Sequence, residues 1–227
     1  KLIEVAEYFG FDGWFLNQET EGTDETPLTA DHAVLMQEFI QAFKAAAGDS
    51  LELMWYDSMT QSGAMDWQNA LTEESQCFLI DDEQQPVADA MFLNFWWTED
   101  DLAPEELLKA SNAKAAELGL DPYDLYAGID VQANGYDTAI KWDLFAADGQ
   151  APYTSLGLYC PSWTYFSASD FFTDYPEREN AFWVNAEGDP FTATAATDTA
   201  WRGVSTYAVE PTVIHAVPFV THFYMGH

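Results

Sequence analysis

Apolar runs alternate with helical segments along this chain of 227 residues, and that alternation constrains the fold more than any other feature. The runs predicted to be strands are 11–17, 51–57, 89–96, 125–132, 155–161 and 213–221. They are hydrophobic throughout rather than alternately apolar and polar, which is typical of parallel strands covered on both faces. Strands separated by helices imply an α/β fold with a parallel sheet, either doubly wound or most of a (β/α)8 barrel.

Two of the connecting segments have the pattern of amphipathic helices. The segment 31–47 is predicted to be capped by Asp31 at its start. Its apolar face is predicted to consist of Leu35, Phe39, Phe43 and Ala46. The segment 104–118 is predicted to be a second helix, with Pro104 in its first turn.

Polar and aromatic residues follow the predicted strands where each one ends. In chain order they are Asn17 and Glu19, Tyr56 and Asp57, Asn94 with Trp96 and Trp97, Asp130 and Gln132, Ser162 and Trp163, and Thr221 and His222. This layout is typical of the active face of a (β/α)8 barrel. A dinucleotide fold has no support, because no GxGxxG turn follows the first strand. We therefore expect residues 1–227 to be part of a TIM-barrel domain, with its early strands missing and both ends truncated.

The composition excludes several classes of function. The net charge is −32 with only seven Lys and Arg, so the surface repels nucleic acids and anionic lipids. No apolar run is long enough to span a membrane. The chain has neither an HExxH nor a CxxC pattern, so we expect no metal site. Aromatic residues make up 16% of the chain, which suits either a sugar-stacking groove or a large aromatic core.

Asn17 and Glu19 are the strongest candidate pair. Side chains alternate along a strand, so these two are expected to point the same way at its end. Glu19 follows aromatic residues and is the candidate proton donor; the alternative is a surface Glu that opens an acidic loop. Asn17 needs hydrogen-bond partners, which a sugar acetamide or a backbone turn would supply.

The nucleophile is left open by the residues themselves. A retaining glycosidase of the usual kind needs a second carboxylate ~5 Å from the acid. Asp57 and Asp130 are the candidates by strand position. Asp57 follows Tyr56, so only one of these two can face the barrel axis, and if Tyr56 does so, Asp57 caps a loop. The alternative is that a 2-acetamido group of the substrate attacks the anomeric carbon, oriented by Asn17.

Several motifs in order along the chain resemble glycoside hydrolase family 85. They are FDGWFLNQET at 11–20, WYDSM at 55–59, DWQN at 66–69, FLNFWW at 92–97, YAGIDVQ at 126–132, LGLYCPSW at 156–163, PFVT at 218–221 and GH at 226–227. The resemblance implies a (β/α)8 barrel and an endo-β-N-acetylglucosaminidase that cuts the chitobiose core of N-linked glycans. It implies retaining, substrate-assisted hydrolysis through an oxazoline, with transglycosylation as a further activity.

Residue by residue, the resemblance implies that Asn17 orients the acetamide, that Glu19 is general acid and then base, and that Tyr56 contacts the acetamide. The residues expected to bind the sugar are Trp67, Phe95, Trp96, Asn94, Asp130 and Trp163. No cofactor is implied. We expect N-glycans or glycoproteins as partners and a monomer with further domains, exported from a bacterium in preference to cytosolic. A barrel that binds glycans without cutting them is the remaining alternative.

Overall fold

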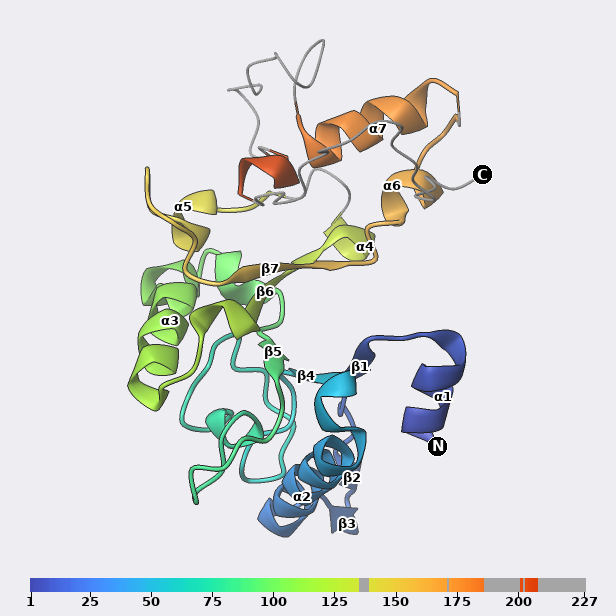
Figure 1. Ribbon diagram of the computed structural model, residues 1–227. Coiled ribbons are helices and arrows are strands. Elements are labelled where there is room, and N and C mark those ends of the chain that lie inside the picture. Colours follow the sequence, from blue (N-terminus) through green and yellow to red (C-terminus); the bar gives the residue numbers. More distant parts are fainter. Residues whose placement is uncertain (135–138, 171, 186–200, 202, 208–227) are drawn as a thin grey trace.

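The computed structural model describes residues 1–134, 139–170, 172–185, 201 and 203–207. Five parallel strands form its central sheet in the order β1-β4-β5-β6-β7 (Figure 1). Their bounds are β1 Gly13–Leu16, β4 Glu52–Tyr56, β5 Ala90–Phe92, β6 Leu125–Asp130 and β7 Ser155–Tyr159. The predicted parallel α/β sheet is confirmed, and the described strands do not close into a complete barrel. The predicted strand 213–221 lies outside the described residues.

The strands are shorter than the apolar runs because the backbone turns away before each run ends. Asn94 has φ 59° and Cys160 has φ 51°, left-handed conformations that a strand cannot accommodate. β5 therefore stops at Phe92, and β7 stops at Tyr159. The polar residue at the end of β7 is consequently Tyr159, three positions before Ser162.

Helices precede, connect and follow these strands. They are α1 Leu2–Phe9, α2 Ala30–Ala47, α3 Leu107–Leu118, α4 Val131–Asn134, α5 Trp142–Phe145, α6 Trp163–Phe166 and α7 Asp174–Trp183. A small antiparallel pair, β2 Gly22–Thr23 and β3 Thr26–Pro27, lies between β1 and α2. In Figure 1, α6 and α7 lie beyond the carboxyl end of β7. None of the helices in the described ranges has the length and apolar character needed to cross a membrane.

Helix α2 differs from its prediction at its start and in its buried face. Thr29, not Asp31, is the cap, and it forms a capping box with His32. The residues that α2 buries are Ala33, Ile40 and Phe43, whereas Leu35 and Phe39 are exposed. The predicted face was wrong because two apolar stripes share Phe43, and only packing against the sheet decides between them.

Helix α3 begins three residues later than predicted. Pro104 lies in a separate short 3-10 helix, Ala103–Glu105. Glu106 then adopts φ 47°, which ends that turn before α3 starts at Leu107. The helix ends at Gly119 in a left-handed cap, the conformation that glycine adopts most easily.

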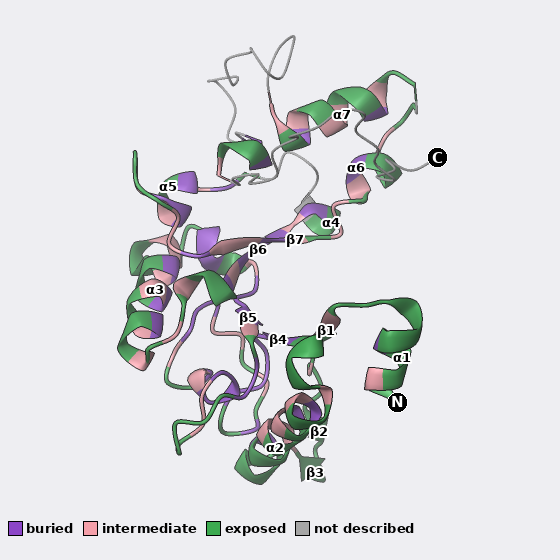
Figure 2. Ribbon diagram, viewed as in Figure 1, coloured by how far each residue is buried: buried purple, intermediate pink, exposed green. Residues whose placement is uncertain are grey.

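The core gathers around the middle strands, as the buried residues in Figure 2 show. Trp55 of β4 is fully buried and stacks on Phe78, with ring centroids 4.0 Å apart. On the opposite face of the sheet, Phe92 extends toward β6 and β7. A Cβ on Gly128 or Gly157 would lie 2.6 Å or less from the Phe92 ring, so these paired glycines make room for it. The carboxyl ends of the strands thus rest on an aromatic layer.

Candidate active site

A cavity of about 550 Å³ opens beside the carboxyl ends of β1, β4 and β7. We call it the first cavity. Its lining residues are Phe15, Asn17, Glu19, Met54, Tyr56, Phe92, Phe95, Tyr126, Leu156, Gly157, Leu158 and Tyr159. Glu19 is the one carboxyl group among them, and most of the others are aromatic or aliphatic. An acid above an aromatic floor can protonate a sugar whose apolar face stacks on the rings.

Asn17 and Glu19 lie side by side just after β1. The Asn17 Nδ2 donates to Glu19 Oε2 at 3.0 Å. The other oxygen of Glu19 accepts from the indole Nε1 of Trp67 at 3.2 Å. The carboxyl group is therefore held from two sides, and its orientation toward the cavity is fixed.

Tyr56 is the buried hydroxyl of the first cavity. Its OH donates to Asn94 Oδ1 at 3.1 Å, and the backbone N–H of Phe95 donates to the same oxygen at 2.9 Å. Burial raises the pKa of Tyr56 above its ordinary value, and the neighbouring carboxyl of Glu19 raises it further. Tyr56 therefore keeps its proton and can act as a hydrogen-bond donor.

Asp57 faces away from the cavity that Tyr56 lines, because neighbouring residues of a strand point to opposite faces. It is 1% exposed, and its Oδ2 accepts from the backbone N–H of Asn69 at 2.6 Å. Burial raises the pKa of Asp57 to about 7, and the N–H groups of Asn69 and Gln68 oppose that effect. Asp57 caps the loop after β4, the role expected for it if Tyr56 faces inward.

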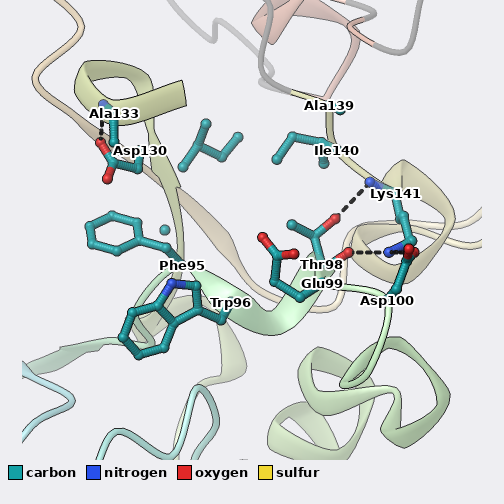
Figure 3. A pocket seen from close by; sticks show the side chains of 12 residues that line it. Phe95, Trp96, Thr98, Glu99, Asp100, Asp130, Ala133, Ala139, Ile140 and Lys141 are labelled. Atoms are coloured by element: carbon teal, nitrogen blue, oxygen red, sulfur yellow. Dashed lines mark hydrogen bonds and ion pairs between the residues drawn. The ribbon is translucent and has the colours of Figure 1, made fainter. Parts of the chain in front are cut away.

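A second cavity of about 670 Å³ adjoins the first, and Phe95 lines both. Figure 3 shows Trp96 and Asp130 on one side of it and Lys141 on the other. Lys141 Nζ pairs with Asp100 at 2.8 Å and also donates to the backbone carbonyl of Thr98. Three carboxyl groups line this cavity, those of Glu99, Asp100 and Asp130. The second cavity is thus the more polar of the two.

The predicted site residues divide among these places. Asn17, Glu19, Tyr56 and Phe95 line the first cavity, and Phe95, Trp96 and Asp130 line the second. Trp67 lies between them, with its ring 5.2 Å from that of Trp96 in an edge-to-face contact. Asn94 is fully buried and lines neither cavity, but it contacts the lining residues Tyr56 and Phe95 through its Oδ1.

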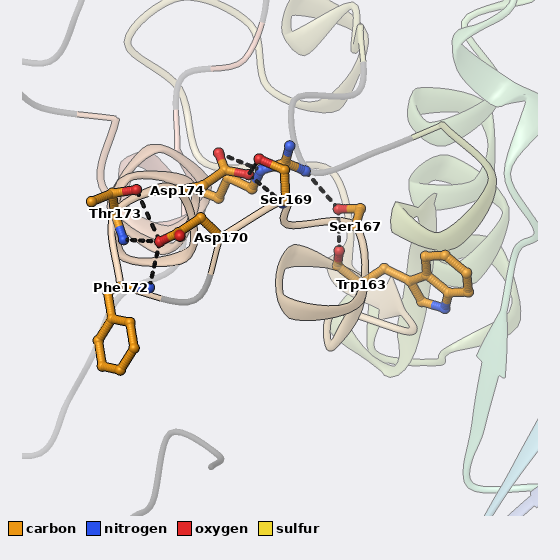
Figure 4. Close-up of polar contacts among 8 residues, drawn as sticks. Trp163, Ser167, Ser169, Asp170, Phe172, Thr173 and Asp174 are labelled. Carbon is orange, nitrogen blue, oxygen red and sulfur yellow. Dashed lines mark hydrogen bonds and ion pairs between the residues drawn. The ribbon is translucent and has the colours of Figure 1, made fainter.

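Trp163 is not brought to either cavity. It begins α6, packs against the core and contacts Phe166. Figure 4 shows its carbonyl accepting from Ser167, next to a polar network around Asp170 and Asp174 at the start of α7. Trp163 was predicted as a strand-end residue, but the chain turns at Cys160 and carries it into a helix instead.

Sequence reasoning missed several lining residues, and two of them, Tyr159 and Lys141, carried a signal that could have identified them. Tyr159 ends β7 and lines the first cavity, and a correct strand end would have indicated it. Lys141 is one of only seven cationic residues, which was a signal in an otherwise acidic chain. Within the described ranges, no group of three His, Cys, Asp or Glu side chains is arranged to hold a metal ion.

An acid, an amide and aromatic rings at the carboxyl ends of parallel strands define a carbohydrate-processing site of the barrel class. The chain belongs to glycosyl hydrolase family 85, whose model matches residues 1–227. Among solved structures it resembles the glycoside hydrolase domain of Endo-D from Streptococcus pneumoniae R6. That match has a TM-score of 0.76 and 29% identity, and covers 90% of this chain and 31% of the other.

Curated relatives are similar over the whole chain. The chain is 27% identical to the cytosolic endo-beta-N-acetylglucosaminidase of Mus musculus and 26% identical to that of Homo sapiens, covering 26% and 25% of them. It is 28% identical to cytosolic endo-beta-N-acetylglucosaminidase 2 of Arabidopsis thaliana, covering 27% of it. In each case all of this chain is matched, so it spans about a quarter of the length of these relatives.

Proposed function

We propose that the protein containing this chain is an endo-β-N-acetylglucosaminidase that cleaves the GlcNAc-β1,4-GlcNAc bond of N-linked glycans. The observation that carries the proposal is the contact between Asn17 Nδ2 and Glu19 Oε2 at 3.0 Å, at the edge of an aromatic-floored cavity. Family membership and the names of the relatives support the same reaction.

The mechanism that we propose is retaining and uses the substrate's own acetamide. Glu19, as a carboxylic acid, donates its proton to the glycosidic oxygen while the acetamide oxygen attacks the anomeric carbon. The bond to the leaving sugar breaks and an oxazolinium ion forms, which keeps the acetamide N–H. Glu19, now a carboxylate, takes a proton from the water that opens this ring, which restores the starting state.

Asn17 and Tyr56 are proposed to hold the acetamide during this reaction. Because Asn17 Nδ2 donates to Glu19, its Oδ1 is the atom left to accept from the acetamide N–H. That contact orients the group and stabilises the positive charge that develops on it. Tyr56 keeps its proton. With substrate bound, its hydroxyl would turn from Asn94 Oδ1, to which it donates here, and donate to the acetamide oxygen instead.

The carboxyl groups around the first cavity favour this mechanism over one with an enzyme nucleophile. Such a nucleophile would need a carboxylate ~5 Å from Glu19. Among the described residues Glu19 is the one acid that lines the first cavity, since Asp57 lies buried behind it and Asp130 lines the second. Trapping with a 2-fluoro sugar tests the point: a labelled Asp57 or Asp130 peptide would contradict the assisted mechanism.

The decisive experiment uses the full-length protein and a high-mannose glycoprotein, read by mass spectrometry. Wild type should leave one GlcNAc on each glycosylated Asn, and Asn17→Ala should lose this activity. A preformed glycan oxazoline should restore turnover and transfer to sugar acceptors in Asn17→Ala, because the step that needs Asn17 is then complete. Normal cleavage by Asn17→Ala would refute the mechanism. Glycan binding by wild type without any product would instead favour the non-catalytic barrel.

Two expectations about the whole protein stay predictions. A monomeric state is one, and sedimentation of the full-length protein tests it. Location is the other: the acidity favoured an exported bacterial protein, whereas the curated relatives are named cytosolic and give that expectation no support.

A further inference from the structure

One buried side chain, that of Asn69, joins the loop after β4 to the loop after β5. Its Oδ1 accepts from the backbone N–H of Trp96 at 3.0 Å. Its Nδ2 donates to the backbone carbonyl of Trp67 at 3.3 Å. The two tryptophans that Asn69 links are the pair in edge-to-face contact between the cavities. One amide therefore fixes the backbone of both.

The backbone of Asn69 is itself held in an uncommon conformation. Its φ is 55°, in the left-handed region, and the residue is only 4% exposed. Its N–H donates to the buried carboxyl of Asp57 at 2.6 Å. A strained residue of this kind persists where its surroundings hold it, and such residues concentrate at functional sites. Asp57 is thus the anchor of the Asn69 turn.

The turn is connected to the reacting acid through Trp67. The Trp67 indole N–H donates to Glu19 Oε1 at 3.2 Å. A shift of the backbone at 67–69 would move that indole and release one side of the Glu19 carboxyl group. Neither Asp57 nor Asn69 lines either cavity. Asn69 contacts the site through Trp67 and Trp96, whereas Asp57 also acts on Tyr56 through its charge.

We propose that Asn69, anchored by Asp57, is a positioning residue that sets the orientation of Glu19 through Trp67. The inference rests on the proposed function, because it concerns the acid of that reaction. It adds two buried residues to the machinery, and it gives the WYDSM and DWQN motifs a shared physical purpose.

The test begins with Asn69→Gly in the full-length protein. Glycine adopts φ 55° without strain and keeps the N–H that binds Asp57, so only the two side-chain contacts are lost. We expect kcat to fall ~10-fold or more with KM changed far less, because misplacing a catalytic group acts on turnover. The matched control is Gln84→Gly, which also replaces a left-handed residue, φ 60°, in an exposed turn; its activity should equal wild type.

A double-mutant cycle with Trp67→Phe separates positioning from a general loss of structure. Phenylalanine removes the indole N–H that binds Glu19, so Trp67→Phe should itself lower kcat. If Asn69 acts through that contact, Asn69→Gly should lower kcat less than ~3-fold in the Trp67→Phe background. The proposal would be overturned if the losses of kcat in the two single variants multiplied in the double variant. It would also be overturned if Asn69→Gly had the kcat of wild type.

Asp57→Asn supplies a second route, because it keeps both side-chain contacts of Asn69 and weakens the anchor. It also removes the Asp57 charge near Tyr56, an effect that should persist in the Trp67→Phe background, whereas the effect of the anchor should not. Asp57→Asn should therefore lower kcat more in the wild-type background than in Trp67→Phe; a full effect in both backgrounds would count against the inference. Failure of the proposed function would be recognised by a different result, because wild type itself would then not cleave the glycoprotein. Wild-type cleavage that is impaired by Trp67→Phe but not by Asn69→Gly would reject the inference alone.

Discussion

The two adjoining cavities differ in the kind of contact they offer, although Phe95 lines both. The first has one carboxyl group above Phe92 and other rings, and its acid is held by an amide and an indole. The second has three carboxyl groups and Lys141, and its contacts come from loops after β5 and β6. Aromatic and aliphatic walls suit the stacking of a sugar beside the acid, whereas a polar lining suits reversible hydrogen bonding to sugar hydroxyls. We therefore propose that bond cleavage takes place in the first cavity and that the second contributes to substrate recognition.

The most severe test of this difference removes Glu19 from the first cavity and Asp130, one of three acids, from the second. Glu19→Gln should lower kcat ~1,000-fold or more, because general acid–base catalysis contributes about 10²–10⁴-fold and Glu19 is proposed to act in both steps. Asp130→Asn should change kcat less than ~10-fold, because its carboxyl lines the second cavity and one oxygen accepts from the backbone N–H of Ala133. Steady-state kinetics on a glycopeptide measures both. Equal losses in the two variants would contradict the assignment.

The contrast between the cavities also shows what the sequence can predict. The first cavity was predictable in large part because Asn17, Glu19 and Tyr56 lie at or just after strand ends, where strand periodicity determines direction. Asn69 could not be predicted, because its role comes from a left-handed turn that brings two loops together. A single turn at Cys160 ends β7 at Tyr159, so Tyr159 lines the first cavity and Trp163, the predicted residue, does not. Local pattern thus predicts strands well, and loop backbone conformation decides the rest.

Asp57, the buried carboxyl that anchors the Asn69 turn, should make the stability of the folded protein depend on pH. Burial raises the pKa of Asp57 to about 7, so between pH 4 and pH 7 the folded state holds a proton that the unfolded state has released. Stability from this group is present below about pH 4 and is lost as pH rises through about 7. The free energy of unfolding of wild type should therefore fall by up to ~4 kcal/mol relative to that of Asp57→Asn as the pH rises across that range, because each unit of pKa shift corresponds to ~1.4 kcal/mol.

Urea unfolding of both proteins at several pH values measures this difference. Tyr56 and Asp66 are the charged or titratable groups that interact with Asp57, and both are kept in the variant. A difference that stays constant with pH would show that Asp57 does not titrate in this range.

The floor of the first cavity predicts an overpacking effect of smaller size. A Cβ on Gly157 would meet the Phe92 ring at 2.4 Å, so Gly157→Ala should destabilise the protein by ~1–3 kcal/mol. Phe92→Leu removes the obstructing ring edge. The double variant should therefore be more stable than the sum of the two single effects predicts, by ~1 kcal/mol. Thermal unfolding measures all three variants, and strict additivity would mean that Phe92 does not determine the need for glycine.

The ion pair of the second cavity should give the smallest effect, because Lys141 and Asp100 are both in contact with water. Lys141 holds the pKa of Asp100 below its ordinary value through a direct hydrogen bond and its charge. Asp100→Asn should lower the melting temperature by no more than ~2 °C, and 1 M NaCl should abolish the difference. Lys141→Gln should lower it further and keep part of its effect in salt, because Lys141 also donates to the Thr98 carbonyl inside the loop. Identical salt responses of the two variants would show that the loop after β5 does not depend on the bond from Lys141 to the Thr98 carbonyl.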